Sequence, residues 1–211
     1  MSGRMSAGRT GALAAALLLA ACAATTPSVP PITSLEGRSC GEHPDLAAAR
    51  PLLLTGKPAT ATLDGASPCW RPPGGPASTV AVFRLPDAAE PYLLTVASEP
   101  VGETLFSPRL LLLDEQGNPV RERRRDTFLF HGPALKTGLR VQPGERFLIV
   151  ASDPDSVGRR NSRIVGNVQQ TTTVAGPVIF NLYTGSEANH DVTYAHNGSV
   201  TVAVEPMPKA Q

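Results

Sequence analysis

The sequence is poor in aromatic residues and in net charge. One Trp, three Tyr and six Phe account for 5% of its 211 residues, whereas it has 21 prolines and 19 glycines. This combination predicts many turns and few long helices. The formal net charge of +1 gives no electrostatic reason to expect nucleic acid or an anionic lipid surface as a partner. A basic cluster at Arg121–Arg125 is diluted by Glu122 and Asp126 and is expected to lie in a solvated loop.

The sequence also lacks the motifs of common catalytic and cofactor sites. It contains no G-x-S-x-G, H-E-x-x-H, G-x-x-x-x-G-K-[ST] or G-x-G-x-x-G pattern. His190 and His196 lie close together in the chain near Asp191, but a metal centre needs at least three convergent ligands. We therefore expect no enzyme activity, no cofactor and no metal site.

The N-terminal residues have the pattern of an exported bacterial lipoprotein. Arg4 and Arg9 precede an apolar run, Ala12–Ala21, which is typical of a signal peptide (residues 1–21) and too short to span a membrane. The run ends in Leu-Ala-Ala-Cys, which matches the lipobox of bacterial lipoproteins. We expect cleavage before Cys22 and acylation of its thiol, each buried CH₂ contributing about 0.8 kcal/mol to membrane binding. An ordinary secretory signal, cleaved nearby, is the alternative.

The residue after Cys22 favours the outer membrane as the location. Ala23 stands where many enterobacterial lipoproteins retained in the inner membrane have aspartate. By that resemblance, the protein is expected on the outer membrane, facing the periplasm, with the membrane as its partner through Cys22. Residues 22–45 are expected to form a lipidated, flexible tether, since they begin with a stretch rich in Thr, Ser and Pro.

Two cysteines remain after Cys22. An oxidising compartment favours a disulfide between Cys40 and Cys69, which closes a loop of about 30 residues and contributes roughly 3–4 kcal/mol. Free or metal-binding thiols are the alternative, but no C-x-x-C pair or suitably spaced histidine accompanies them. The disulfide is expected to hold residues 46–78 as an N-terminal arm against the body of the protein.

Residues 79–206 contain short apolar or alternating segments separated by turn residues, which predict β-strands. A polar surface loop is expected over Asp153–Arg163. About eight strands with such turns predict an all-β fold, an antiparallel β-sandwich of jelly-roll or immunoglobulin-like winding. The segments expected to be strands include Thr79–Leu85, Tyr92–Ala97, Arg109–Asp114, Arg146–Ser152, Thr171–Val174, Val178–Tyr183 and Ser199–Val204.

Three stretches of the sequence, each overlapping one of these expected strands, resemble a known family. They are LFSPRLLLLDEQGNPVR at Leu105–Arg121, RFLIVASDPDSVG at Arg146–Gly158, and the GSVTV strand near the C-terminal end. Together they resemble the maltose operon periplasmic protein (MalM-like) family, and the same layout is similar to bacterial pre-peptidase C-terminal β-sandwich domains. The MalM resemblance implies a periplasmic or envelope protein whose gene accompanies sugar transport.

Two functions are compatible with these features. The first is a non-enzymatic, lipid-anchored envelope accessory protein, linked to maltose or maltodextrin uptake through contacts with envelope or transport proteins. The alternative is a carbohydrate-binding β-sandwich module. A module needs exposed aromatic side chains beside polar groups, whereas an interaction protein needs an apolar surface or an unpaired sheet edge. The candidate residues for binding a glycan are Trp70, Tyr92, Tyr183 and Tyr194.

Overall fold

A computed structural model describes residues 29–175 and 178–207 of the chain. The expected signal peptide and Cys22 lie outside the described residues. Within the described part there are 14 β-strands and one 3₁₀ turn, η1 (Arg125–Thr127). The same part contains no helix that is long and apolar enough to cross a membrane. The all-β class predicted from the sequence is therefore confirmed.

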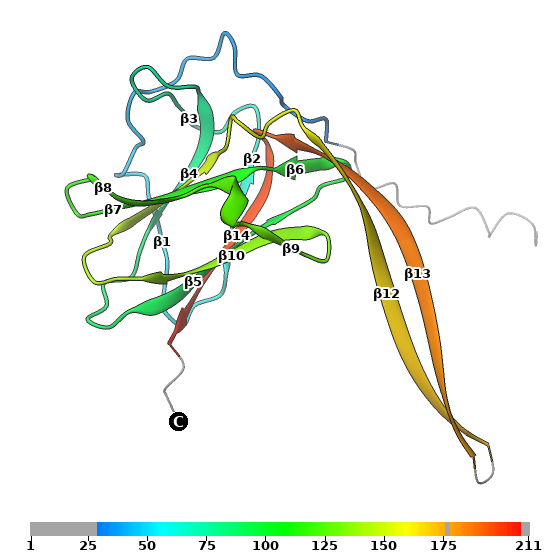
Figure 1. Ribbon diagram of the computed structural model, residues 1–211. Helices are drawn as coiled ribbons and strands as arrows, with labels where there is room; N and C mark the ends of the chain where they lie inside the picture. The colour runs from blue at the N-terminus through cyan, green and yellow to red at the C-terminus, as the bar shows by residue number, and fades with distance from the viewer. Residues whose placement is uncertain (1–28, 176–177, 208–211) are drawn as a thin grey trace, which may run out of the picture.

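Two sheets face each other and form a sandwich, as Figure 1 shows. Neighbouring strands within them are antiparallel, apart from β1 and β4, which are parallel. In spatial order, the first sheet consists of β1 (Arg50–Pro51), β4 (Ser78–Arg84), β11 (Phe147–Ser152), β7 (Pro108–Leu113) and β8 (Pro119–Arg123), with β3 (Cys69–Trp70) also paired to β4. The second consists of β2 (Ala59–Leu63), β14 (Gly198–Pro206), β5 (Tyr92–Glu99), β10 (Ala134–Val141) and β9 (Leu129–His131).

The main core lies between the two sheets. Strand β11 is buried along its whole length, which explains why its sequence is a continuous apolar run rather than an alternating one. Leu148 of β11 lies opposite Phe83 of β4 and Leu112 of β7, and all three side chains are fully buried. A second apolar cluster, which includes Ile149, covers the outer face of the first sheet, and the half-buried Trp70 packs against this cluster.

A disulfide joins Cys40 and Cys69, as the sequence predicts, and their Cα atoms are 4.6 Å apart. Backbone hydrogen bonds extend the connection: the Gly41 N–H donates to the Cys69 carbonyl at 2.9 Å, and the Arg71 N–H donates to the Gly41 carbonyl at 2.9 Å. The indole N–H of Trp70 donates to the Glu42 carbonyl at 3.0 Å. The segment around Cys40 is thereby held against β3.

The sequence predicts that the sandwich domain starts at residue 79. In the structure, strands before that residue already belong to the two sheets. Strand β2 pairs with β14, in a register that sets Thr60 opposite Thr201, and their hydroxyls lie 3.2 Å apart. Strands β1 and β3 both pair with β4. Residues 46–78 thus contribute strands to both sheets, because short segments acquire backbone hydrogen bonds from neighbours that are distant in the sequence.

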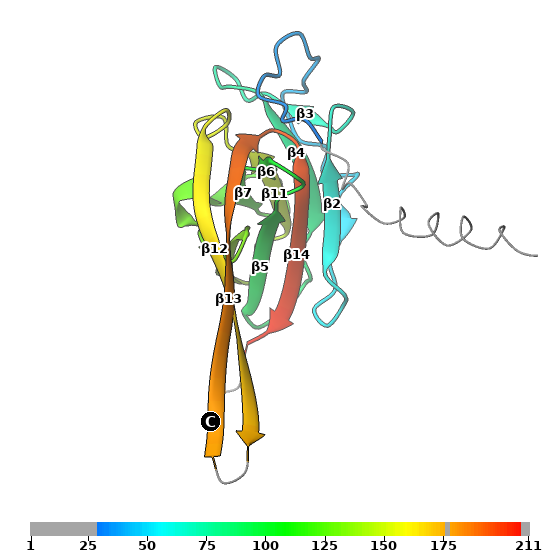
Figure 2. The ribbon, with the colours of Figure 1, turned by 90° about the vertical axis from the view of Figure 1, so that its right-hand side faces the viewer.

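A long two-stranded hairpin projects from the sandwich (Figures 1 and 2). It consists of β12 (Arg160–Ala175) and β13 (Val178–Ala195), paired from Arg160↔Thr193 to Ala175↔Val178. Strand β6 (Thr104–Phe106) joins it in parallel at Thr193–Ala195. The polar loop that the sequence predicts over Asp153–Arg163 therefore ends just before Arg160, where β12 begins. Backbone pairing with β13 orders the last residues of the expected loop as a strand.

His196 links three separate segments at the base of this hairpin. Its side chain is 5% exposed, and its Nδ1 lies 2.7 Å from the Ser152 hydroxyl. That hydroxyl also accepts the Thr79 N–H at 3.0 Å, and the His196 N–H donates to the Ile32 carbonyl at 2.8 Å. Burial, with a smaller contribution from the positive charge of Arg38, lowers the pKa of His196 to about 4.

This histidine predicts a loss of stability in mild acid. In the unfolded chain a histidine has a pKa near 6.5, so between that value and about 4 the unfolded state binds the extra proton. The stabilisation is complete above pH 6.5 and is lost as the pH falls toward 4, by about 2–3 kcal/mol. Urea unfolding between pH 7 and pH 4.5 measures this loss.

The His196→Gln variant is the control for this prediction. It should be less stable than the wild type at pH 7, since the buried hydrogen bond to Ser152 is altered, yet it should show a shallower decline between pH 6.5 and 4.5. Equal slopes for the two proteins would show that other groups cause the acid sensitivity.

Candidate ligand-binding cleft and projecting arm

A cleft of about 460 Å³ opens where η1, the loop after β11, and the paired ends of β12 and β13 meet. We call it the arginine cleft. Its volume lies within the range of typical ligand sites, roughly 300–1,000 Å³. The residues that line it are Arg124, Arg125, Asp126, Asp153, Asp155, Ser156, Arg159, Arg160, Asn161 and Tyr194.

The loop after β11 positions one wall of the cleft. The Ser156 hydroxyl donates to the Asp153 carboxylate at 2.6 Å, and both side chains are buried. Gly158 has φ +85°, a conformation that glycine adopts without strain. Its N–H donates to the Tyr194 carbonyl at 2.8 Å, and the Tyr194 N–H donates to the Arg159 carbonyl at 3.0 Å. These bonds place Arg159 next to Tyr194 on β13.

Tyr194 and Arg125 form the centre of the cleft. The Tyr194 side chain is 6% exposed, and its hydroxyl accepts hydrogen bonds from Arg125 Nη2 at 2.5 Å and Asn161 Nδ2 at 3.2 Å. The Arg125 guanidinium carbon also lies 4.8 Å from the centre of the Tyr194 ring, within cation–π range. Arg125 Nη1 donates to the Phe128 carbonyl at 3.2 Å. The Nε atom of Arg125 is buried and has no hydrogen-bond partner among the described residues.

The charges of the cleft are not neutralised in pairs. Four arginines and three aspartates line it. Arg124 pairs with Glu122 at 3.5 Å, which is outside the cleft lining. In the part of the chain that the structure describes, neither Arg125, Arg159 nor Arg160 forms an ion pair, and no group of three His, Cys, Asp or Glu residues is arranged to hold a metal.

Of the expected aromatic residues whose side chains the structure describes, Tyr194 lines this cleft and Trp70 and Tyr92 do not. Tyr92 is 3% exposed, and its hydroxyl donates to the Pro86 carbonyl at 3.2 Å; burial raises the pKa of this phenol well above its usual range. Trp70 is half-buried on the first sheet, with the Arg109 guanidinium 5.3 Å from its ring. The side chain of Tyr183 lies outside the described part of the structure. Trp70, Tyr92 and Tyr194 therefore do not form one stacking platform.

The arginines of the cleft were not predicted as a site. The basic cluster Arg121–Arg125 was expected to be a solvated loop, and Arg159–Arg160 lies more than 30 residues further along the chain. The signal that could have found them is the pair of separate Arg-Arg motifs, one directly after β8 and one at the start of β12. Their convergence depends on the fold, because no local periodicity relates them.

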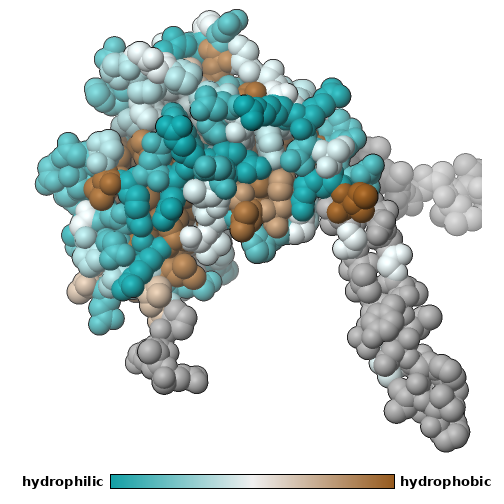
Figure 3. Space-filling model, in the orientation of Figure 1, coloured by the Kyte–Doolittle hydropathy of each residue, from teal (hydrophilic) through white to brown (hydrophobic). Residues whose placement is uncertain are grey.

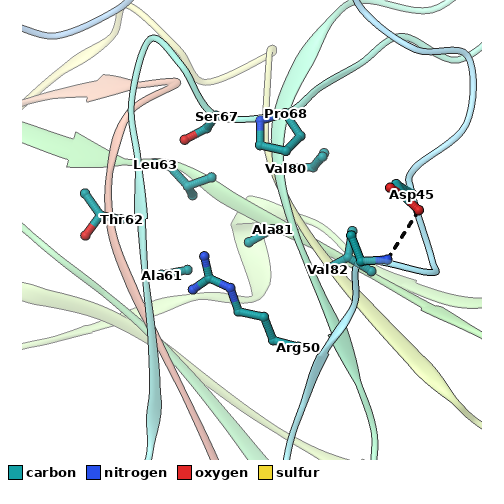
Figure 4. A pocket seen from close by; sticks show the side chains of 11 residues that line it. Asp45, Arg50, Ala61, Thr62, Leu63, Ser67, Pro68, Val80, Ala81 and Val82 are labelled. Atoms are coloured by element: carbon teal, nitrogen blue, oxygen red, sulfur yellow. Dashed lines mark hydrogen bonds between the residues drawn. The ribbon is translucent and has the colours of Figure 1, made fainter.

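A second cavity, of about 280 Å³, lies at the side of the sandwich between β2 and β4 (Figure 4). Apolar residues such as Ala61 and Val80 line most of it. The charged groups at its rim are engaged: Arg50 Nη1 donates to the Thr60 carbonyl at 3.2 Å, and the Asp45 carboxylate accepts the Ala48 N–H at 3.3 Å. None of the described residues that line it is aromatic, so they do not offer the usual means of stacking on a sugar ring.

The outer part of the β12–β13 hairpin, residues 165–175 and 178–188, is called the arm here. Within the described residues, β12 has β13 as its one strand neighbour, and β6 reaches β13 only at Thr193–Ala195. The sequence from Val165 to Ser186 contains no Asp, Glu, Lys, Arg or His. Strand edges without a neighbour are templates for pairing with another chain. By contrast, the sandwich face in Figure 3 is mainly hydrophilic, with small separate apolar patches.

Comparison with protein families identifies a similar segment. Residues 76–152 match the family model described as maltose operon periplasmic protein precursor (MalM). The resemblance predicted from the sequence is confirmed over this MalM-like segment, which runs from just before β4 to the end of β11. The arm, β14 and the wall of the cleft that contains Tyr194 lie outside the matched residues. No curated protein and no solved structure matches the chain.

Proposed function

We propose that this protein is a lipid-anchored accessory protein of the bacterial envelope, held by Cys22 on the periplasmic face of the outer membrane. Its role is to assist maltose or maltodextrin uptake by binding another envelope protein, without catalysis. The match of residues 76–152 to a maltose operon periplasmic family supports the periplasmic location and the link to maltose. The observation that carries the binding role is the arm.

The arm has the properties of an element that binds a partner by strand addition. Its β12 segment, residues 165–175, extends about 36 Å at roughly 3.3 Å per residue. An isolated two-stranded ribbon is at best marginally stable in water. The uncharged stretch from Val165 to Ser186 does not provide the charged residues that usually protect an edge. A partner that offers an extended strand would pair with an edge of the ribbon by strand addition.

Shortening the hairpin tests this function. Ile164 and Asn189 are opposite each other in the register, so residues 165–188 can be replaced by Asn-Gly, which forms a tight two-residue turn. The sandwich should keep its Tm within a few degrees. Chemical cross-linking in intact cells should capture a maltose-transport or outer-membrane partner with the wild-type protein but not with the short-hairpin variant.

Leu129→Ala is the matched control, because Leu129 is an exposed apolar residue (66% exposed) on the sandwich. It should leave the cross-linked product unchanged. If the short-hairpin variant yields the same product as the wild type, the arm is not the docking element. If maltodextrin uptake is the same in cells with and without the protein, the link to sugar uptake is wrong.

Carbohydrate binding is the second candidate function, and the arginine cleft favours it. Tyr194, Asn161 and the cleft carboxylates supply hydrogen-bond donors and acceptors in one concave site, as glycan recognition requires. The Tyr194 ring is packed into the core and covered by Arg125, so binding there would depend on hydrogen bonds and charge rather than on stacking.

A further inference from the structure

We infer that the arginine cleft binds a small anionic sugar, one that carries a phosphate or a carboxylate beside its hydroxyls, in preference to a neutral glucan. The inference rests on the second function proposed above, carbohydrate binding, and specifies its ligand class. Three observations support it: the contacts that fix the Arg125 side chain, the positive charges at the mouth of the cleft, and the carboxylates that can accept hydrogen bonds from sugar hydroxyls.

Arg125 is held in a fixed position with binding capacity left over. Its guanidinium carbon lies 4.8 Å from the Tyr194 ring centre and 5.7 Å from that of Phe130. The Arg163 guanidinium lies 3.7 Å from the Phe130 ring, so a second cation stacks on the same ring. Nη1 and Nη2 of Arg125 each donate one hydrogen bond to a protein oxygen. Each of these nitrogens carries a second N–H, for which no acceptor lies among the described residues. An anionic oxygen is the strongest acceptor for such a donor.

Arg159 and Arg160 add positive charge at the mouth of the cleft. Both residues are exposed, and neither forms an ion pair within the described residues. Guanidinium groups bind phosphate and carboxylate oxygens through two parallel hydrogen bonds. Three guanidinium groups without an ion-pair partner among the described residues therefore line one concave site, where an anionic group can accept from them.

The carboxylates of the cleft indicate that the ligand also carries hydroxyls. Asp153 already accepts the Ser156 hydroxyl and is buried, so its charge is partly satisfied. Asp126 and Asp155 are exposed lining residues, and they would repel an ion that filled the whole cleft. A sugar avoids this conflict, because its anionic group can lie beside the arginines while its hydroxyls donate to the aspartates.

Titration calorimetry on the purified full-length protein tests the inference. The probes are glucose 6-phosphate, glucuronate, inorganic phosphate, glucose and maltotriose. At least one of the two anionic sugars should bind tenfold or more tightly than glucose and maltotriose, and its affinity should fall as salt is raised. Comparison of the first two probes identifies whether phosphate or carboxylate is preferred.

Two variants locate the site. Arg159→Gln and Arg160→Gln change exposed side chains, so they should retain the wild-type Tm, and each should weaken the anionic sugar about tenfold. Arg140→Gln is the matched control, because Arg140 is an exposed arginine on β10, outside the cleft lining. It should bind like the wild type.

The possible outcomes separate this inference from the functions proposed above. Equal binding of maltotriose and the anionic sugars, unaffected by the arginine variants, would overturn the inference and leave carbohydrate binding intact. If inorganic phosphate binds as tightly as glucose 6-phosphate and glucuronate, the cleft does not recognise the sugar, and that part of the inference is overturned. No binding of any probe would overturn both the inference and carbohydrate binding, while the docking role of the arm would be unaffected.

Discussion

Replacement of both Cys40 and Cys69 by serine is expected to destabilise the protein by about 3–4 kcal/mol, which corresponds to a Tm lower by roughly 10 °C for a chain of this size. The two cysteines are 29 residues apart in the sequence. Without the bond, the unfolded chain gains the freedom of an open loop of that length. The enclosed segment contains β1 and β2, which lie at the edges of the two sheets.

Thermal unfolding followed by circular dichroism measures this effect. Reductant should lower the Tm of the wild type toward that of the double-serine variant and should leave the variant unchanged. This comparison separates the loss of the covalent bond from any effect of the serine side chains. A wild-type Tm that does not respond to reductant, in a protein whose thiols are shown to be reduced, would mean that packing alone holds this segment.

The Cys22→Ser variant is expected to move from the membrane fraction to the soluble periplasmic fraction. Several acyl chains on one residue hold a protein at a bilayer almost irreversibly, since each buried CH₂ contributes about 0.8 kcal/mol. Labelled palmitate should enter the wild type and not the variant. The Cys40→Ser/Cys69→Ser protein is the control, and it should keep both the label and the membrane association. If Cys22→Ser stays with membranes to the same extent as the wild type, the lipid anchor is wrong.

Such an anchor would also fix where the arm lies. The Thr104 hydroxyl of β6 donates to the Val29 carbonyl at 2.5 Å, and the Ile32 N–H donates to the Asn197 side chain at 2.7 Å. The chain thus enters the folded body at the base of the β12–β13 hairpin. Seven residues from Cys22 to Ser28 span at most about 25 Å when extended. A lipid on Cys22 would therefore keep the base of the arm close to the membrane, where envelope partners are found.

Strands with a clear hydrophobic pattern could be predicted from the sequence. The alternation at Thr79–Leu85 and the apolar run at Arg146–Ser152 correspond to β4 and β11, and the latter is buried on both faces as such a run indicates. The pairing of Cys40 with Cys69 followed from their number and from the expected compartment. The predicted strands Thr171–Val174 and Val178–Tyr183 lie within β12 and β13. The length of the hairpin could not be predicted, because the polar residues on either side of these segments have no alternation that distinguishes a strand from a loop.

The arginine cleft could not be predicted from the sequence, for a different reason. Arg125 and Tyr194 are 69 residues apart, and nothing local relates them; the turn at Gly158 and the pairing of β12 with β13 bring them together. The sequence by itself determined the all-β class, the core strands and the disulfide. Hydrophobic periodicity identifies strands from neighbouring residues, and two cysteines in an oxidising compartment leave one possible pair. Only the tertiary structure decided how far the hairpin projects and that the arginine cleft forms. Backbone pairing in the hairpin can be made by any polar sequence, and the cleft joins side chains that are far apart in the chain.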